Sequence, residues 1–348
     1  MDTNKKRIEY LDIAKGIGIL LVVWAHAKAP GTPYIYEMHM PFFFIISGLL
    51  YNSSRPFGPY IKSKILSLYI PFIFWNCLFY TTKSFLHGVS IKAIITTNVK
   101  ILLTLDKDGQ FFGATWFLGA LFVTSVVYKI IDVCLKDSKY KPFIMLAIFS
   151  AIGIFGFAVT LDFMLSRVCV LSMFFSFGVL VKHFKEQLKA IDGIILASIS
   201  VIIFLLIGRY NYGDVNMGLN QYRSPVLFCI GAVAASYALL YLCRKIEFFS
   251  QKFRVVKLTK NVMAFFGKKS LDILIWQFNA FRVIIVLQMY IYKDPFTLAE
   301  LWSHYPVYVT ANGWWFLYTV AGMILPIMLC SILRAKPLGY ITKKIHIV

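Results

Sequence analysis

The sequence has too few charged residues to cover the surface of a soluble protein of its size. Charged side chains make up 15% of its 348 residues, whereas hydrophobic ones make up 59%, and the mean hydropathy is +0.71. A soluble domain needs a polar surface, so this composition excludes an ordinary cytosolic globule. Aromatic residues, at 17%, and apolar runs recur along the whole chain, and both indicate a polytopic membrane protein.

Acidic residues are scarce as well. There are 16 Asp and Glu against 36 Lys and Arg, which gives a formal net charge of +20. In a soluble protein such an excess suggests nucleic-acid binding. This chain has no polar, basic domain for that purpose, and its basic residues gather in the connections between apolar runs. The charge therefore indicates membrane topology and no nucleic-acid partner.

The sequence also lacks the cysteine patterns of metal sites and disulfide frameworks. None of its cysteines forms a Cys-x-x-Cys pair or has a histidine at metal-binding spacing. We interpret them as packing residues and expect no metal; they are Cys77, Cys134, Cys169, Cys229, Cys243 and Cys330.

Ten apolar segments are long enough to cross a bilayer, at roughly 20 residues each. They lie near residues 10–29, 36–51, 65–80, 114–135, 142–160, 163–181, 190–207, 225–243, 270–291 and 314–334. With the N-terminus inside, and with Lys28, Lys129 and Arg334 counted with the sides that their span ends face, 25 of the 36 basic residues fall on the inner side, 8 on the outer side and 3 within spans. The sequence thus predicts an all-α polytopic membrane protein with cytoplasmic N- and C-termini. We expect a single membrane-embedded domain over residues 1–348.

Two of these segments contain residues that are unusual in a membrane span. The first also resembles a secretory signal, but Asp12 and Lys15 interrupt it, so we interpret it as an uncleaved span. The third contains Pro71, which is expected to bend its helix.

Ionisable side chains within spans are costly and therefore mark candidate sites. Five stand out: Asp12, Lys15, Arg167, Asp272 and Arg282. Their excess of one positive charge favours an anionic ligand. Asp12 and Lys15, three residues apart, are able to pair on one helix face, and snorkelling of Lys15 is the plainer alternative.

Lys15 and His26 share one face of the first predicted helix. Eleven residues at about 100° each bring them to within about 20° of each other, and the rise between them is about 16 Å. A cation at one end suits the phosphates of a donor, and a neutral imidazole at the other suits a general base, although a lone His is often a packing residue.

The predicted topology also collects residues near the outer face. His26, His39, Trp116 and Arg167 all fall at outer ends of spans, which suggests a vestibule. Trp116 could equally be an interface anchor. The outer segments 81–113 and 208–224 are long, and the second is rich in Tyr, Asn and Gln, which suits carbohydrate as well as a solvated loop.

Several motifs are familiar in combination. Three of them are the segments RIEYLDIAKGIGILLVVWAH, HMPFFFIISGLL and ATWFLGALF. The first contains Lys15 and His26 in a basic-x10-His pattern, and the second contains a Phe-Phe-x-x-Ser-Gly pattern at Phe43, Phe44, Ser47 and Gly48. Arg167 follows later in the chain, with Phe174, Phe175 and Gly178 after it. Across nearly the whole chain these segments resemble the bacterial membrane acyltransferase family 3. The triplet at His39, Met40 and Pro41 is similar to the fucose 4-O-acetylase-like subgroup. Gln277 stands where relatives often carry His, so no second catalytic imidazole is expected there.

This resemblance implies an inner-membrane enzyme that passes an acyl group, usually acetyl from cytoplasmic acetyl-CoA, to a hydroxyl of an envelope or exported glycan. It implies a general base, His26, with Arg167 or backbone amides for the oxyanion and Asp12 orienting Lys15. Lys15 would hold the donor phosphates. We also expect Arg282 to contribute to binding of the acyl donor, and His39, Trp116 and Ser47 to contribute to binding of the acceptor.

Other interpretations stay open at this stage. Ser47 could carry a transient acyl group, although no nucleophile elbow surrounds it. Intramembrane charges and ten helices also fit a secondary transporter of a glycan or organic anion, although the paired repeats typical of that class are absent from the sequence. A membrane scaffold without catalysis is the third class. The acceptor sugar and the size of the acyl group are left open.

Overall fold

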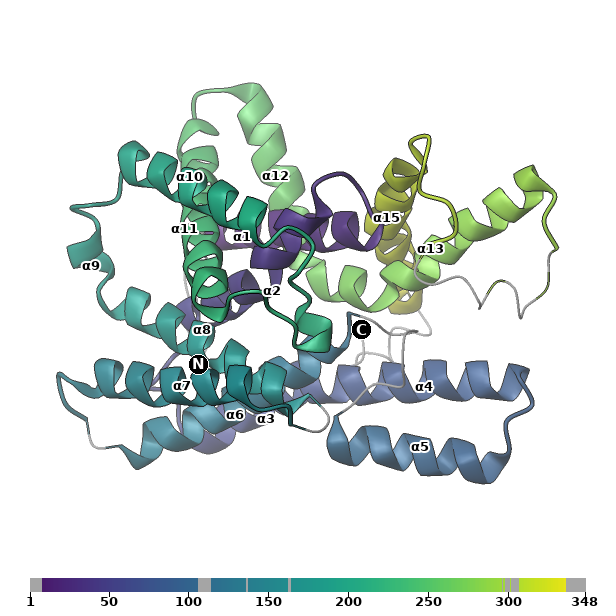
Figure 1. Cartoon of the computed structure of the whole chain (residues 1–348), viewed down its shortest axis with the longest axis horizontal. Helices are drawn as coiled ribbons and strands as arrows, with labels where there is room; N and C mark the ends of the chain where they lie inside the picture. Colours follow the sequence, from purple (N-terminus) through teal and green to yellow (C-terminus); the bar gives the residue numbers. More distant parts are fainter. Residues whose placement is uncertain are drawn as a thin grey trace.

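The computed structural model describes residues 8–105, 114–135, 137–161, 164–295, 297, 301 and 307–335. Within these ranges the protein is helical, and the sole β-type pairing is an isolated bridge between Asn216 and Gln221 (Figure 1). The first half contains α1 (Glu9–His26), α2 (Thr32–Leu49), α3 (Phe57–Lys64), the π-helical turn η1 (Ile65–Tyr69), α4 (Ile70–Leu86), α5 (Ile91–Thr104), α6 (Trp116–Cys134) and α7 (Lys141–Ala158). The second contains α8 (Leu165–His183), α9 (Lys185–Leu188), α10 (Ile194–Tyr210), the 3-10 turn η3 (Met217–Leu219), α11 (Pro225–Phe249), α12 (Arg254–Lys268), α13 (Ser270–Tyr292) and α15 (Trp314–Arg334).

Each of the ten apolar segments predicted from the sequence contains a helix. By length and composition, seven helices of the described residues are able to cross a membrane: Phe57–Leu86, Trp116–Cys134, Lys141–Ala158, Leu165–His183, Pro225–Phe249, Ser270–Tyr292 and Trp314–Arg334. Helix α10 is a shorter apolar helix, and α1 and α2 carry charged or polar residues such as Lys15 and Glu37. The protein is thus a multi-pass, all-helical membrane protein, while the ten crossings and the cytoplasmic ends stay predictions; residues 1–7 and 336–348 lie outside the described ranges.

The predicted boundaries differ most around the third segment. The sequence predicted a span near 65–80, whereas α3, η1 and α4 form one continuous helical stretch from Phe57 to Leu86. The irregularity expected at Pro71 takes the form of the π-helical turn that ends just before it. A proline removes one backbone donor, and a wider turn upstream accommodates that loss.

Two helices lie outside the predicted spans. Helix α5 occupies most of the described part of the predicted outer loop 81–113, and α12 occupies the basic connection between the eighth and ninth segments. Each turn of these two helices contains both apolar and polar residues. Neither helix therefore has the continuous apolar run by which membrane spans are recognised.

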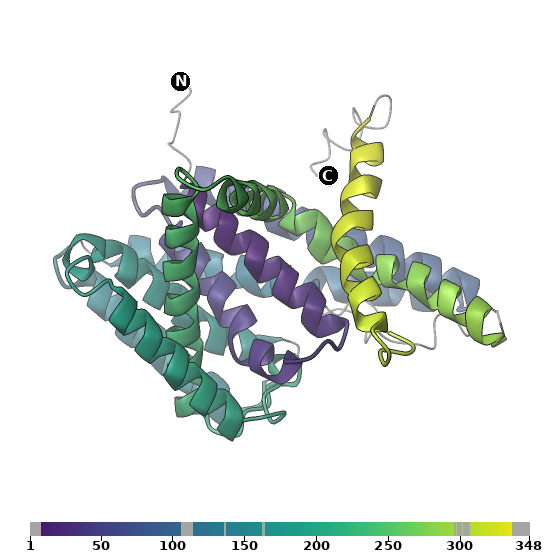
Figure 2. The same ribbon diagram turned by 90° about the horizontal axis from the view of Figure 1, so that it is seen from above.

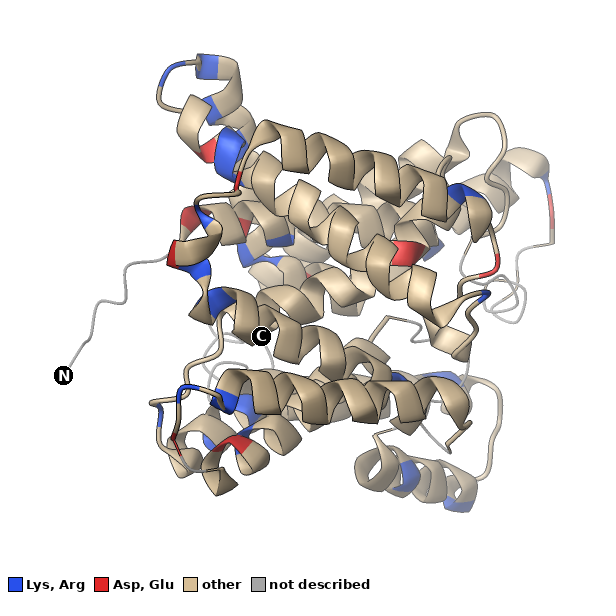
Figure 3. Cartoon of the chain, turned by 60° about the vertical axis from the view of Figure 1, so that its left-hand side comes forward, with Lys and Arg blue, Asp and Glu red and all other residues tan. Residues whose placement is uncertain are grey.

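Helix α1 lies at the centre of the molecule. It contacts α2, α11, α12, α13 and α15, and Figure 2 shows α1 and α2 between α11 on one side and α13 with α15 on the other. Its apolar residues, such as Ile13, Ile19 and Val23, are buried against these neighbours. Most Lys and Arg residues lie near helix ends and in connections (Figure 3).

Glycines bring two helix pairs into backbone contact. A side chain at Gly16 or Gly267 would overlap the backbone of the facing helix, so α1 and α12 approach closely there. Gly48 and Gly178 do the same for α2 and α8. Small residues at helix crossings are typical of membrane proteins, because close packing replaces the hydrophobic driving force between helices.

Candidate active site

One cavity of about 940 Å³ runs beside α1 and α2. Its size is typical of sites for small molecules and cofactors. It is lined from α1 by Lys15, Ile19, Val22, Ala25 and His26, and from α2 by Tyr36, His39, Met40, Phe43, Ile46 and Ser47. Ser67 and Leu68 of η1, the start of α6 around Trp116, the loop residues 216–219, and the junction of α12 and α13 complete the wall.

A cationic end of the cavity is formed by Lys15. Its ammonium lies 3.7 Å from the carboxylate of Asp12, one turn earlier on α1, and 28% of the Lys15 side chain is exposed. Asp12 is buried and is absent from the lining. Lys268 and Ser270, at the junction of α12 and α13, line the same cavity. This end therefore offers two ammonium groups and a hydroxyl to an anionic group.

His26 lies on the last turn of α1 and also lines the cavity. It is about 16 Å from Lys15 along the helix, by the rise of an α-helix. The edge of its imidazole packs against Phe278 of α13, with 4.9 Å between ring centroids. The cavity is thus long enough to hold one ligand that reaches both residues.

A second imidazole, that of His39, faces the same cavity from α2. Its Nδ1 lies 2.8 Å from the Ile35 carbonyl oxygen. A ring nitrogen that bonds a carbonyl oxygen carries the hydrogen, so Nε2 of His39 is left as an acceptor in the neutral ring. Tyr36, one turn before His39, packs at 5.5 Å from its ring centroid and lines the cavity as well.

Arg167 stacks on Trp116, and Trp116 in turn lines the cavity. The guanidinium carbon of Arg167, on α8, lies 5.1 Å from the centroid of the Trp116 ring, which is buried at the start of α6. Stacking of this kind fixes a guanidinium in one orientation while its N–H groups remain able to donate. Trp116 lines the cavity and Arg167 does not.

The other residues predicted for the site lie at the edge of the cavity or outside it. Ser47 lines the cavity, but its hydroxyl donates to the Phe43 carbonyl at 2.8 Å. Arg282 lies outside the lining and donates to the Leu301 carbonyl at 2.9 Å. Asp272 accepts two hydrogen bonds from Arg334, at 2.6 and 2.7 Å. Gln277 is buried outside the lining. The roles predicted for all the site residues stay predictions.

The segment between α10 and α11 covers the His26 end of the cavity. Asn216, Met217, Gly218 and Leu219 line it, and the bridge between Asn216 and Gln221 closes this segment into a small hairpin. Asn211, at its start, donates to the buried carboxylate of Glu37 on α2 at 3.4 Å. The Tyr- and Asn-rich loop noted in the sequence is therefore an ordered wall of the site.

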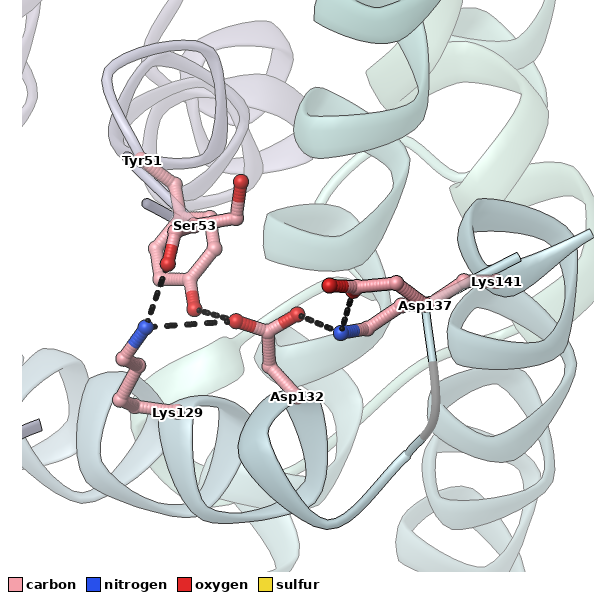
Figure 4. Close-up of polar contacts among 6 residues, drawn as sticks. All are labelled: Tyr51, Ser53, Lys129, Asp132, Asp137 and Lys141. Atoms are coloured by element: carbon pink, nitrogen blue, oxygen red, sulfur yellow. Dashed lines mark hydrogen bonds and ion pairs between the residues drawn. The ribbon is translucent and has the colours of Figure 1, made fainter. Parts of the chain in front are cut away.

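A second polar cluster lies outside the cavity and was missed in the sequence. Asp132 of α6 accepts from the Tyr51 hydroxyl at 2.5 Å and pairs with Lys129 at 3.4 Å and Lys141 at 3.1 Å (Figure 4). Lys129 is 2% exposed and also donates to the Ser53 carbonyl at 2.8 Å. The cluster joins the end of α2 to α6 and α7. The signal was present as Lys129 and Asp132 at a spacing of three near the end of an apolar run.

Within the described part of the chain, no group of three or more His, Cys, Asp or Glu side chains is arranged to hold a metal ion. The six cysteines are free; Cys229 and Cys243 lie on α11, and the other four lie on four different helices. The expectation that the chemistry uses no metal stays a prediction.

These features define a class: a multi-pass membrane protein with a cavity that carries Lys15 and Lys268 at one end and imidazoles, together with Lys28, at the other. The acyltransferase domain family matches residues 8–333. The chain therefore belongs to membrane acyltransferase family 3, which confirms the family predicted from the sequence and, with it, the class of acyltransferase enzymes.

Curated relatives are similar over part of the chain. The nodulation protein NolL of Mesorhizobium japonicum is 30% identical over 146 residues, and that of Sinorhizobium fredii is 29% identical over 145 residues. The matches cover 37% and 36% of this chain, which spans 37% of the length of each relative. No solved structure matches the chain. The family does not favour the transporter alternative.

Proposed function

We propose that this protein transfers an acetyl group from acetyl-CoA to a hydroxyl of a cell-envelope or exported glycan. The observation that carries the proposal is that Lys15 and His26 line the same cavity, about 16 Å apart along α1. An elongated donor that binds by its phosphates at Lys15 would then present its thioester toward the imidazoles. The family supplies the reaction type, acyl transfer.

The proposed membrane is the bacterial inner membrane, with the Lys15 end of the cavity open to the cytoplasm. The excess of Lys and Arg on the predicted inner side supports this orientation. Acetyl-CoA is a soluble cytoplasmic metabolite, and the glycan acceptor would approach the His26 end from the other face. In this proposal residues 1–348 act as one membrane-embedded domain.

At the donor end the proposed ligands are the ammonium groups of Lys15 and Lys268. Phosphates form their strongest hydrogen bonds with cationic donors in partly buried sites. Asp12, paired with Lys15 at 3.7 Å, would hold the ammonium toward the cavity. Arg282 bonds the Leu301 carbonyl, so we assign it no step in donor binding.

At the acceptor end the proposed general base is His26. The acceptor hydroxyl oxygen attacks the thioester carbonyl carbon, its proton passes to the imidazole, and the carbon–sulfur bond breaks as the coenzyme A thiolate leaves and takes up that proton. Arg167, held on the ring of Trp116, would donate to the developing oxyanion. The sugar would be positioned by the side chains of His39, Ser47 and Asn216, which line the cavity.

Ser47 is unsuited to a covalent step in this scheme. Its hydroxyl already donates to the Phe43 carbonyl, and no base bonds its oxygen among the described contacts. A nucleophilic serine needs an adjacent base to remove its proton. We therefore propose direct transfer between donor and acceptor.

The test separates donor binding from transfer in purified protein. Lys15→Ala is expected to weaken acetyl-CoA binding by roughly 10-fold in calorimetry, since one charged contact is lost. His26→Ala is expected to leave that affinity nearly unchanged and to abolish acylation of the glycan. Lys28→Ala is the matched control, because Lys28 lines the cavity at its other end.

Two outcomes would overturn the proposal. Protein that binds neither coenzyme A nor its thioesters would remove the donor, and a His26→Ala variant with normal glycan acylation would remove the base. Equal loss of donor affinity in Lys15→Ala and His26→Ala would contradict the division of roles between the two ends of the cavity.

A further inference from the structure

Helix α12 has three distinct faces, and one of them covers a wall of the cavity. Its residues Met263 and Gly267 face α1, and the backbones of the two helices meet at Gly16 and Gly267. Gly267 and Lys268, at its end, line the cavity beside Lys15. On the same face, the Nζ of Lys260 lies 3.0 Å from a carboxylate oxygen of Glu9, at the start of α1, and forms an ion pair with it. Any force on α12 therefore acts directly on the cationic end of the site.

The opposite face is an exposed apolar stripe made of Val255, Leu258, Val262 and Phe265. These side chains are 76%, 65%, 37% and 46% exposed, and at about 100° per residue they fall within an arc of about 80°. The stripe lies about 140° around the helix from Met263 and Gly267. Among the described residues no other helix packs over it.

A basic face adjoins the stripe. Arg254 and Lys257 are exposed and occupy the next sector of the helix, together with Asn261, whereas Lys268, at the end of the same sector, is exposed but also lines the cavity. Within the described residues Arg254, Lys257 and Lys268 form no ion pair, whereas the neighbouring Arg244 and Lys269 pair with Asp192 and Asp272. Lys245 and Lys252 precede the helix in the sequence, so the connection that leads into it is also basic.

We propose that α12 binds anionic phospholipid in the cytoplasmic leaflet and that this contact sets the affinity of the donor site. This inference rests on the proposed function for its donor. Cations beside an exposed apolar stripe on one helix fit phosphate headgroups that adjoin acyl chains, which is the pattern of interfacial amphipathic helices. A free coenzyme has phosphates but no acyl chain to cover Leu258 and Phe265, so the stripe selects lipid.

The coupling follows from the packing at Gly267. Because α12 meets α1 backbone to backbone at Gly267, the placement of α12 on α1 fixes where Lys268 lies relative to Asp12 and Lys15. Lipid that holds the stripe and the basic face keeps Lys268 beside Lys15. In a bilayer without anionic lipid that restraint is weaker, and the donor loses a cationic partner.

The experiment uses the full chain in nanodiscs of phosphatidylcholine, with or without phosphatidylglycerol. Native mass spectrometry measures the phosphatidylglycerol retained, and calorimetry measures acetyl-CoA affinity. The wild type is expected to retain phosphatidylglycerol preferentially and to bind acetyl-CoA several-fold more tightly in its presence. R254Q/K257Q is expected to lower retention by about fivefold for each charge removed and to lose the lipid-dependent gain in affinity.

Two further variants sharpen the comparison. L258S/F265S keeps every charge but breaks the stripe, and it is expected to lose retention as well. K92Q/K100Q removes two exposed cations from α5, which also carries exposed apolar residues, and is expected to leave both readouts unchanged.

The contrary outcomes are distinct. Equal acetyl-CoA affinity in both lipids, or equal phosphatidylglycerol retention by the α12 and α5 variants, overturns the inference while the proposed function stands. Loss of acetyl-CoA affinity in R254Q/K257Q to the same degree in both lipids means that the cations bind the donor directly, which also overturns it. Absence of acetyl-CoA binding in every lipid, with lipid retention intact, refutes the proposed function instead.

Discussion

At the scale of single residues, the contact between Arg167 and Trp116 gives a sharp test of the acceptor end. Arg167→Lys keeps the charge but loses the planar stack on the indole and the fixed fork of N–H donors. Turnover is expected to fall roughly 100-fold with acetyl-CoA affinity unchanged, since an oxyanion donor acts only during transfer. Steady-state kinetics and calorimetry on the same preparation measure both quantities. Arg209→Lys, at the exposed end of α10, serves as the control.

The buried cluster around Asp132 carries a prediction about stability. Asp132→Asn leaves the ammonium of Lys129, 2% exposed, beside a neutral group. Breaking a buried pair from one side costs about 3–5 kcal/mol, so unfolding in detergent should shift to clearly lower temperature. Adding Lys129→Met is expected to recover part of the loss.

Asp137 offers the matched control for that experiment. It also pairs with Lys141, at 2.8 Å, but 97% of its side chain is exposed. Asp137→Asn should therefore leave the unfolding temperature unchanged. A thermal shift of equal size in both variants would mean that burial of the Asp132 cluster contributes nothing.

Residues of the site that share one helix can be predicted from the sequence, whereas those that the tertiary fold brings together cannot. Lys15 and His26 share a helix, so spacing alone predicted that they share a face. The Asp132 cluster combines side chains from α6, the end of α2 and the start of α7, and only the tertiary fold buries Lys129. Lys268 was likewise assigned to a connection, and its place in the cavity depends on how α12 packs on α1.

At the scale of helices, long apolar runs were sufficient to locate every predicted segment but not its ends. The stretch from Phe57 to Leu86 is far longer than predicted, because polar residues such as Lys62 and Lys64 continue a helix that hydropathy alone would end. Helix α12 was missed because its helical periodicity is not accompanied by high overall hydropathy, and the partly amphipathic stretch that forms α5 was assigned to an outer loop. Periodicity would have revealed both.

The crossing of α1 and α12 predicts the effect of a small substitution. Gly267→Ala places a methyl group against the Asp12 carbonyl and must push the helices apart. The overpacking is expected to destabilise the protein by about 1–3 kcal/mol and to weaken donor binding, because Lys268 moves away from Lys15. Gly58→Ala, where a methyl group meets nothing, is the control. Normal thermal stability and donor affinity in Gly267→Ala would contradict the close crossing.

At the scale of the whole molecule, the distribution of basic residues predicts the topology. Reporter enzymes fused after Ser53 and Ser138 are expected to remain in the cytoplasm, and those fused after Gly88 and Gly213 to reach the outer side. Each position is fused separately to a phosphatase that is active only outside and to a fluorescent protein that fluoresces only inside. The two signals together show on which side of the membrane the fusion point lies. Phosphatase activity after Ser138 would contradict the predicted orientation.

The π-helical turn from Ile65 to Tyr69 has an evolutionary consequence. A turn of this kind holds one residue more than the α-helix around it, so the helical halves on either side tolerate its loss. Removing that residue would leave α3 and α4 intact but rotate Ser67 and Leu68 out of the cavity wall by about 100°. Insertions and deletions, which ordinarily break a transmembrane helix, could here exchange the side chains that touch a ligand. Homologues of different length at this point are expected to differ in substrate.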